Sequence, residues 1–372
     1  LRHIEVQILR DQEGNTKVLG LRDCSVQRNN QKIIEESAST ALPKHLEEKV
    51  YDYSAKLADA VDYNGAGTVE FIYNLDVNDV YFMEMNTGLQ VEHPVTELVT
   101  GIDIVGKQFS IASGGSIKNL KIKSKGYAIE VRINAEKAVI QGTEVNFIPN
   151  AGKITKFSLP EDKNIQILKS IDSDKEVTPF YDSMVVQIIC YGKDRNDTIA
   201  KMLKYLDKVV IEGVSTNIPM LKDILQDEIF INGVYDTNFL PKYLNRIDQA
   251  KLVEDFAKSA GQSGQNVTKE SLTIEGSSEL KVLAPASSIF YSSPSPTEPS
   301  YVKEGDIVSV NQTLCLMEAM KMFSPLNLKS FNAQGNALYD ADIQYQIVRI
   351  HNAEGQQVNH GDLLFVIKPV MH

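Results

Sequence analysis

Two glutamates on neighbouring strand-like segments have the types and spacing of a cation site. Glu70 lies in GTVEFIY (67–73) and Glu84 in VYFMEMN (80–86), and the turn-rich stretch NLDVND joins them, which predicts a hairpin. In register, the two carboxylates approach each other across the strands, where like charges destabilise by up to about 1 kcal/mol. We therefore expect a positive group between them, and Mg²⁺ prefers such oxygen ligands. The pattern alone equally allows two solvent-facing glutamates.

A lysine between two methionines is the second candidate. Lys321 lies in MEAMKM (317–322), a strand-like run followed by a small residue and then the lysine. A hairpin turn at this point would project the ammonium from the tip of the domain. A primary amine on a long, flexible stem can be acylated and can swing an attached group between sites. For Met-Lys-Met in isolation, a solvated turn lysine is the simpler interpretation.

The segments that must position the glutamates predict α+β structure. Residues 1–112 contain β-rich runs and one helix at about 44–62, and six residues are expected to share its buried face: Leu46, Val50, Tyr53, Leu57, Ala58 and Val61. A second α+β unit is expected over 113–245. It has a helix at about 195–207 with these residues inward: Ile199, Met202, Leu203 and Leu206.

The remaining chain predicts a linker and an all-β domain. Residues 246–279 begin as a short polar helix and become rich in Ser, Gly, Gln and Asn, which favours a flexible linker. Residues 280–370 show no helical period. Within them, EGDIVSVNQTLCLME (304–318) matches EGQQVNHGDLLFVIK (354–368) without gaps. This internal repeat predicts a two-fold pseudo-symmetric β-sandwich or flattened barrel.

Charge and composition exclude several classes of function. The 372 residues carry a net charge of −11, which disfavours non-specific binding to nucleic acid. No run of eighteen apolar residues occurs, so we expect no membrane span. The three cysteines, Cys24, Cys190 and Cys315, have neither disulfide-framework nor zinc-site spacing, and a reducing cytoplasm is therefore expected.

The segment around Lys321 resembles the biotin carboxyl carrier, or biotinyl, domain family. The resemblance lies in five segments: VLAP, FYSSPSP, VKEGDIV, TLCLMEAMKM and GDLLFVI. It implies a flattened all-β barrel in which Lys321 carries biotin in amide linkage, attached by a biotin protein ligase. Residues 290–300 resemble the protruding thumb of bacterial acetyl-CoA carboxylase carriers. The stretch 323–350 is longer than the corresponding part of most carriers, which predicts an enlarged loop.

Residues 1–245 resemble the biotin carboxylase family, an ATP-grasp ligase. The resemblance lies in RDCSVQRNNQKIIEE, GAGTVEF, MNTGLQVEHPVTE, EVRINAE and PFYDSM. It begins midway through the family's ATP-grasp domain. It therefore implies the second half of that domain over 1–112 and the carboxylase C-terminal α+β domain over 113–245.

The same resemblance implies roles for individual residues, carried over by motif position. Glu70 and Glu84, with Asn86 beside them, would bind Mg²⁺ (or Mn²⁺) and the ATP phosphates. His3 and Gln27 would contact the ribose or the phosphates of ATP. The bicarbonate pocket would consist of Lys32, Gln90, Val91 and Glu92. Glu92 would act as general base on bicarbonate, and Arg132 would stabilise the biotin enolate. For Lys32 and Arg132, the residues alone favour ion pairs with neighbouring glutamates.

Two positions depart from the family pattern. Gly88 stands where MNTRLQVEHP has arginine, and Asn30 stands where QRRHQK has histidine. A guanidinium clamps bicarbonate in a way that glycine cannot. The family's glycine-rich phosphate loop, adenine-contacting strand and nucleotide lysines lie upstream of these 372 residues. We therefore expect a partial sequence of a longer subunit, inactive on its own.

The resemblances together predict the biotin carboxylase and carrier subunit of an acyl-CoA carboxylase, most simply an acetyl-CoA carboxylase of fatty acid biosynthesis. ATP, bicarbonate, Mg²⁺ and biotin are implied as substrates and cofactors. A separate carboxyltransferase subunit and a homodimer through the carboxylase part are implied as partners. The alternative is a catalytically impaired fragment or a pure biotin carrier or interaction protein. A third interpretation is an ATP-grasp ligase without biotin.

Overall fold

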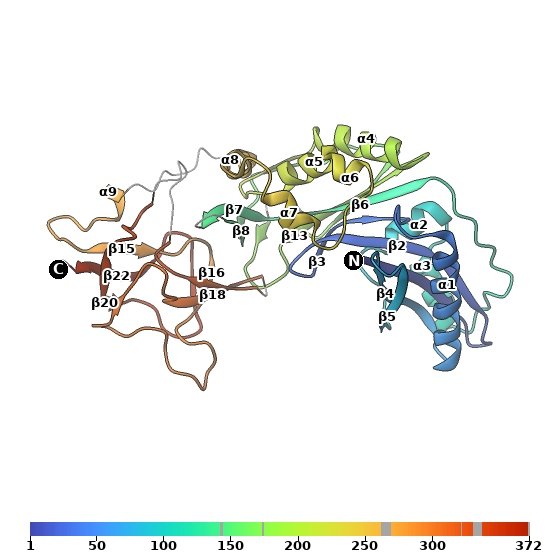
Figure 1. Ribbon diagram of the computed structural model, residues 1–372, viewed down its shortest axis with the longest axis horizontal. Coiled ribbons are helices and arrows are strands. Elements are labelled where there is room, and N and C mark those ends of the chain that lie inside the picture. Colours follow the sequence, from blue (N-terminus) through green and yellow to red (C-terminus); the bar gives the residue numbers. More distant parts are fainter. Residues whose placement is uncertain (142–143, 173–174, 262–268, 321, 330–336, 371–372) are drawn as a thin grey trace.

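The computed structural model contains two units joined by one chain segment. It describes residues 1–141, 144–172, 175–261, 269–320, 322–329 and 337–370. In Figure 1 the larger unit, built from residues up to about 260, lies at the right in blue to yellow. The smaller unit, orange to red, lies at the left. In the described part of the chain, no helix has the length and apolarity needed to cross a bilayer.

A single eight-stranded sheet forms the centre of the larger unit. In spatial order its strands are β11 (Ile165–Lys169), β13 (Met184–Gly192), β6 (Tyr127–Asn134), β3 (Gln31–Glu36), β2 (Thr16–Arg28), β1 (Arg2–Arg10), β4 (Gly65–Asn74) and β5 (Asp79–Asn86). The predicted hairpin of β4 and β5 is confirmed, with Glu70 directly opposite Glu84. The order also places β6, which is distant in sequence, beside β3, and β13 lies on the far side of β6.

Three helices cover the first half of this sheet, and they are α1 (Lys44–Ala60), α2 (His93–Thr100) and α3 (Ile104–Ala112). The predicted helix at 44–62 is confirmed as α1, but its buried face was partly wrong. Tyr53 and Val61 are 44% and 57% exposed, while Ser54 is buried and bonds the Val50 carbonyl. Tyr53 instead lies near the Lys49 ammonium, 5.6 Å from the ring centre.

The second half of the larger unit contains five further helices among the described residues. They are α4 (Arg195–Leu206), α5 (Ile218–Gln226), α6 (Glu228–Ile231), α7 (Phe239–Leu244) and α8 (Gln249–Ser259). Its short strands are β7 (Glu136–Gln141), β8 (Glu144–Pro149), β9 (Gly152–Lys153), β10 (Lys156–Ser158), β12 (Glu176–Val177) and β14 (Val210–Glu212). Helix α4 packs on β6 and β13, and α7 packs on β2. Helix α4 matches the predicted helix, and Tyr205 is buried with Ile199, Met202 and Leu206.

Ordered structure extends into the range expected to be a linker. Helix α8 buries Leu252 and Phe256 in the core of the larger unit. Helix α9 (Lys269–Leu272) follows, and Leu272 joins the core of the smaller unit. Residues 262–268 lie outside the described part of the chain. The exact domain boundaries remain a prediction.

The smaller unit consists of two four-stranded sheets. One contains β15 (Leu280–Leu283), β22 (Leu363–Val370), β20 (Gln344–Ile350) and β17 (Ile307–Val308), and the other contains β19 (Met322–Leu326), β18 (Cys315–Ala319), β16 (Ser288–Tyr291) and β21 (Gln356–Val358). The repeat gives equivalent environments. Gly305 and Gly355 both have positive φ, and Val308 and Val358 are both buried.

A two-residue turn fixes the register of β2 and β3. Asn29 and Asn30 have φ of 49° and 63°, a left-handed conformation that asparagine tolerates better than most residues. The turn places Gln27 directly opposite Lys32. The conformation of the turn therefore gives a structural reason for asparagine at position 30, where the family pattern has histidine.

Candidate active site

A ladder of ionisable side chains crosses four adjacent strands. Glu84 pairs with Glu70, Glu70 with Glu5, and Glu5 with Arg22, each in direct cross-strand register. Glu5 and Arg22 are fully buried, and the Arg22 guanidinium bonds Glu5 Oε2 at 3.2 Å. It also bonds Gln90 Oε1 at 3.2 Å. Arg22 therefore connects the sheet to the loop that precedes α2.

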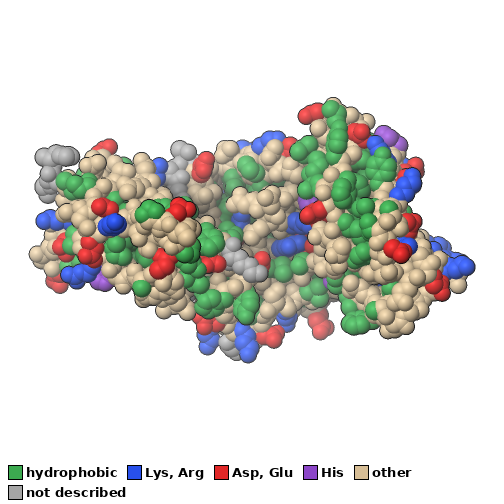
Figure 2. Space-filling model, turned by 90° about the horizontal axis from the view of Figure 1, so that it is seen from below, with side chains coloured by type: hydrophobic (Ala, Val, Ile, Leu, Met, Phe, Trp, Pro, Cys, Tyr) green, Lys and Arg blue, Asp and Glu red, His purple; other side chains and the backbone are tan. Residues whose placement is uncertain are grey.

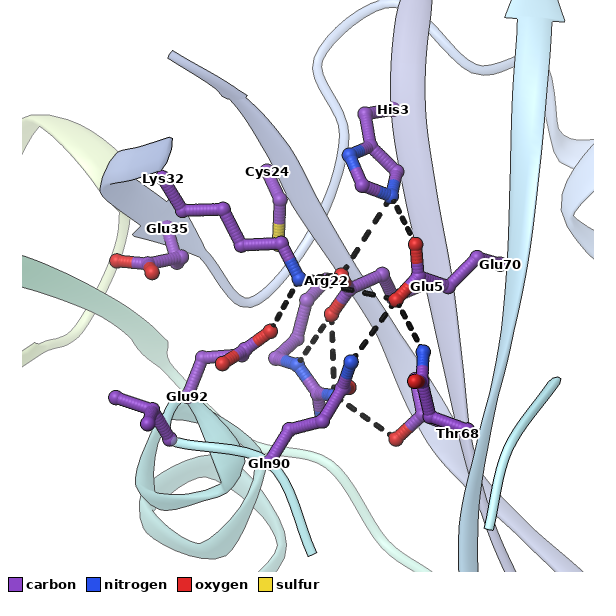
Figure 3. Close-up of polar contacts among 12 residues, drawn as sticks. His3, Glu5, Arg22, Cys24, Lys32, Glu35, Thr68, Glu70, Gln90 and Glu92 are labelled. Carbon is purple, nitrogen blue, oxygen red and sulfur yellow. Dashed lines mark hydrogen bonds and ion pairs between the residues drawn. The ribbon is translucent and has the colours of Figure 1, made fainter. Parts of the chain in front are cut away.

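Lys32 lies at the centre of the site, where carboxylates surround its ammonium (Figure 3). Its Nζ donates to Glu92 Oε1 at 2.5 Å and to Glu5, and it lies 3.8 Å from Glu70 Oε1. Burial opposes the charge, but the nearby carboxylates outweigh it and raise the pKa of Lys32 above its ordinary value. The lysine is therefore a permanent cation of this pocket.

Arg132 on β6 provides the second cation of the pocket. Its Nε donates to Glu35 Oε1 at 2.6 Å, and its NH2 group donates to Glu92 Oε2 at 3.0 Å. Burial alone would raise the pKa of Glu92. The cations Arg22, Lys32 and Arg132 reverse this effect and hold that pKa well below its ordinary value. Glu92 is therefore ionised and doubly ion-paired.

Glu70 is held by polar side chains on every side. Its Oε2 accepts from His3 Nε2 at 2.7 Å, and its Oε1 accepts from Asn86 Nδ2 at 2.6 Å and Gln90 Nε2 at 2.9 Å. Burial would raise its pKa, but the bond from His3 and the charge of Lys32 lower it to about 2. The site therefore keeps Glu70 as a carboxylate.

A cleft of about 2450 Å³ contains these side chains and extends to the smaller unit. The predicted residues that line it are His3, Gln27, Lys32, Glu70, Glu84, Asn86 and Gln90. Figure 2 shows basic side chains within the hollow in the middle of the molecule, where β3 and β13 lie in Figure 1. Apolar residues that the sequence did not single out, Ile72 and Leu240, form part of the wall.

A second pocket of about 370 Å³ opens beside Lys32, Glu92 and Arg132. Gly88 directly precedes Leu89, which lines this pocket. A Cβ added to Gly88 would have no atom within 4 Å apart from those of Gly88 and its chain neighbours. The Val91 side chain is 39% exposed, while the Val91 carbonyl accepts from Gln187 Nε2 at 2.9 Å. The structure thus brings the four predicted bicarbonate residues, Lys32, Gln90, Val91 and Glu92, together around one pocket.

The carboxylates are suitable for a hard divalent cation. Glu70 and Glu84 face each other across the hairpin, Glu70 is ionised, and Asn86 lies beside them in the same cleft. Carboxylate and amide oxygens are the ligands that Mg²⁺ accepts, together with phosphate oxygens. Among the described residues, the ligand atoms that lie within 4.8 Å of those of Glu70 belong to His3 and Glu5, and this group does not include Glu84. The metal set of Glu70, Glu84 and Asn86 remains a prediction.

The hairpin of β18 and β19 approaches this site from the smaller unit. Its last cross-strand pair is Ala319 with Met322. Met320, with a positive φ of 52°, is 2% exposed and belongs to the apolar cluster of the larger unit. Its backbone N–H donates to the Pro179 carbonyl at 2.5 Å, and Gln31 Nε2 donates to Met322 Sδ at 3.5 Å. Lys321 itself lies outside the described residues.

Sequence reasoning missed three residues that hold the site together, and they are Glu5, Arg22 and Gln187. The expected ion pair of Arg132 with Glu35 is confirmed. All three missed residues are buried polar side chains inside apolar strands. A charged or polar residue at an inward-facing position of a buried strand could have indicated them, because such a side chain is rarely buried without a partner. Their partners depend on the order of the strands, which the local pattern does not give.

Three family models match the chain. The model described as carbamoyl-phosphate synthase L chain, ATP binding domain, matches residues 1–120, and the biotin carboxylase C-terminal domain matches residues 130–242. The model described as biotin-requiring enzyme matches residues 280–330. The matches agree with the two resemblances drawn from the motifs.

Individual relatives give the same result. Biotin carboxylase 1 of Bacillus subtilis is 45% identical over 244 residues, which are 65% of this chain and 53% of the relative. The chain therefore spans about half the length of the curated relatives it matches.

Solved structures match as well. The biotin carboxylase domain of Hydrogenobacter thermophilus 2-oxoglutarate carboxylase, in complex with MgADP, ADP and bicarbonate, has a TM-score of 0.61 and 38% identity, covering 65% of this chain and 52% of that one. A single-chain, multi-domain long-chain acyl-CoA carboxylase matches with a TM-score of 0.61 and 26% identity. The match covers 100% of this chain and 34% of the carboxylase chain. The chain is therefore similar to biotin carboxylases over residues 1–242 and to biotin-requiring enzymes over residues 280–330.

Proposed function

We propose that this chain is part of a subunit that carboxylates its own tethered biotin with ATP and bicarbonate. One observation carries the proposal. Both sequence neighbours of Lys321 contact the larger unit, Met320 at Pro179 and Met322 at Gln31. Gln31 itself lines the pocket of Lys32, Glu92 and Arg132. A biotin on Lys321 would thus be delivered to two cations and a carboxylate suited to an anionic substrate.

The residues of the pocket act on bicarbonate by exchanging partners. Glu92 is a weak base while Lys32 and Arg132 bind it, because both cations stabilise its ionised form. A bound bicarbonate would take over these two cations. The pKa of Glu92 then rises toward its ordinary value, and the carboxylate can accept the bicarbonate proton. Substrate binding therefore switches on the base.

The cofactors supply what the side chains lack. Biotin offers a ureido nitrogen as the acceptor of CO₂, and Mg²⁺ neutralises charge on the nucleotide phosphates. Glu70 and Glu84 would hold the metal, His3 and Gln27 would contact the nucleotide, and Asn86 would keep Glu70 oriented. Arg132 would hold negative charge that develops near the acceptor.

The finer assignment is an acetyl-CoA carboxylase of fatty acid biosynthesis, acting with a separate carboxyltransferase subunit, a biotin protein ligase and a second copy of this chain. The loop at 290–300 and the short segment between the two units support it. Three buried free cysteines support a reducing cytoplasm. Bicarbonate-dependent ATP hydrolysis by the full-length protein, stimulated by free biotin, tests the proposed activity. Its absence would overturn the activity.

Docking of the hairpin gives a separate prediction. Met320→Ala should lower carboxylation of tethered biotin by roughly 10- to 100-fold, because a buried methionine contributes about 1.5–3 kcal/mol, while turnover of free biotin stays unchanged. The measurement compares both rates in protein whose biotin content has been checked by intact mass. Ile307→Ala, an exposed apolar position in the same unit, is the control. Equal loss with free and tethered biotin would contradict docking through Met320.

The second candidate is a biotin carrier whose carboxylase pocket binds bicarbonate poorly. It is favoured by the two cations of the pocket, which are already paired with Glu5, Glu35 and Glu92, and by the missing guanidinium at Gly88. The open space at this position should accept an arginine without strain.

Gly88→Arg therefore discriminates between the two candidates. If the chain is a working carboxylase with a weakened anion site, the variant should lower the KM for bicarbonate roughly tenfold, equivalent to about 1.4 kcal/mol. The ATP hydrolysis rate at varied bicarbonate measures it, and Gly88→Gln controls for the added side chain. No bicarbonate dependence in either variant would favour the carrier.

A further inference from the structure

Two buried carboxylates lie opposite each other where β3 meets β6. Glu35 and Glu130 are direct cross-strand partners, and both are 0% exposed. Glu35 Oε1 accepts from Arg132, and Glu130 Oε1 accepts from Gln187 Nε2 at 2.9 Å. Among the described residues, the second oxygen of each carboxylate, Oε2, has no hydrogen-bond partner. Both orphan oxygens therefore require an explanation.

The nearby charges cannot compensate two ionised groups. Arg132 binds Glu35 and also Glu92, and its Nε lies 3.9 Å from Glu130 Oε1. Lys32 is shared by Glu5 and Glu92. A second negative charge at this position would be buried with one shared and more distant cation to compensate it, and proteins avoid that cost by neutralising the group.

We propose that Glu35 and Glu130 share a single proton, carried by Glu130, and that this neutral acid keeps the charge of Arg132 available to the anionic substrate. A hydrogen on Glu130 Oε2 that is donated to Glu35 Oε2 gives both orphan oxygens a partner. Glu35 keeps its charge because a guanidinium binds it, whereas Glu130 is bound by an uncharged amide. The role toward the substrate rests on the proposed function, but the shared proton does not.

The electrostatic surroundings agree with this assignment. Burial raises the pKa of Glu130 well above its ordinary value, and the charge of Glu35 adds to the effect. Burial also raises the pKa of Glu35, to about 7, against the charge of Arg132. The pair therefore titrates as a unit.

The elements packed around the pair contribute few other charges. Strand β3 adds Lys32, the residue before α2 adds Glu92, and β13 adds the uncharged Gln187. The titratable residues of α2, His93 and Glu97, face each other at 4.0 Å.

The shared proton predicts a dependence on pH in a definite direction. A proton that the folded state holds more tightly stabilises the fold at low pH, and this contribution is lost as pH rises from the ordinary glutamate range toward the raised pKa of the pair. Loss of the proton also adds a negative charge beside Arg132. The KM for bicarbonate should therefore rise with pH, roughly tenfold across the titration.

Glu130→Gln tests the shared proton directly because the amide imitates the neutral acid but cannot titrate. The infrared spectrum of the full-length protein at neutral pH should contain the C=O band of a protonated carboxyl group, shifted in D₂O and absent from this variant. Glu136→Gln is the matched control, since Glu136 is also buried but is ion-paired with Arg28. The control should retain the band. A band that persists in Glu130→Gln would overturn the proposal.

Two further measurements do not depend on the spectrum. The Tm of Glu130→Gln minus that of the wild type should increase with pH, and a difference that is constant over pH would overturn the shared proton. The KM for bicarbonate should become insensitive to pH in the variant, and a profile identical to the wild type would overturn the role toward the substrate. If the band and the Tm behave as expected but no variant hydrolyses ATP, the shared proton stands and the proposed function fails.

Discussion

Replacing Lys321 by arginine should leave the chain without biotin and abolish carboxylation of the tethered group. Arginine keeps the positive charge and the length of the side chain, but its guanidinium does not form the amide that a primary amine forms. Intact mass after co-expression with a biotin protein ligase should show the biotinyl increment in the wild type and none in the variant. The turnover of free biotin should be unaffected.

The matched control for this experiment is Lys303→Arg, an exposed lysine of the same unit. It should be biotinylated like the wild type, which shows that the domain still folds and is recognised. A biotinyl increment on Lys321→Arg would place the attachment elsewhere and remove the basis of the proposed function. An unmodified wild type would favour an ATP-grasp ligase without biotin.

Glu92→Gln should lower bicarbonate-dependent ATP hydrolysis by about 10²–10⁴-fold, the usual contribution of a general base. The amide keeps the shape of the side chain but cannot accept the proton. Since the carboxylate also binds Lys32 and Arg132, removing its charge should free these cations. The rate constant should therefore fall while the KM for bicarbonate is unchanged or lower.

Glu97→Gln, on the helix that Glu92 precedes, controls for the substitution itself. Glu97 accepts a hydrogen bond from the Ile104 backbone through Oε1, which glutamine can also provide. This variant should retain the wild-type rate. A rate in Glu92→Gln equal to that of the control would assign the base to another residue.

The local features of this fold could be predicted because neighbouring residues determine them. The β4–β5 hairpin depends on a turn between two alternating segments, and α4 depends on helical spacing and an Asp194 cap. The internal repeat of the smaller unit could be recognised from identical residues at equivalent positions. In the structure, Gly305 and Gly355 of the two repeats both have positive φ. The family motifs then brought Lys32, Glu92 and Arg132 into one prediction.

The remaining features depend on contacts between distant strands. Glu5 and Arg22 become partners because β1 lies beside β2, and Glu35 meets Glu130 because β3 lies beside β6. Nothing within either segment specifies these neighbours. Tyr53 on α1 was wrongly predicted to be buried, since helical spacing shows which side of a helix is apolar but not how much of that side the sheet covers. The small Ser54 faces the sheet instead.

The pairing of β3 with β6 has a consequence for how the larger unit holds together. The first family model ends before β6 and the second begins within it, yet both contribute strands to one continuous sheet. The border between the two matched sequence regions therefore runs between two hydrogen-bonded strands, β3 and β6. Without the other region, each of these strands would be an unpaired edge of the sheet. The predicted site residues Lys32 and Arg132 lie on the two strands that meet at this border, so a change that weakens the pairing of β3 with β6 should also disturb the pocket.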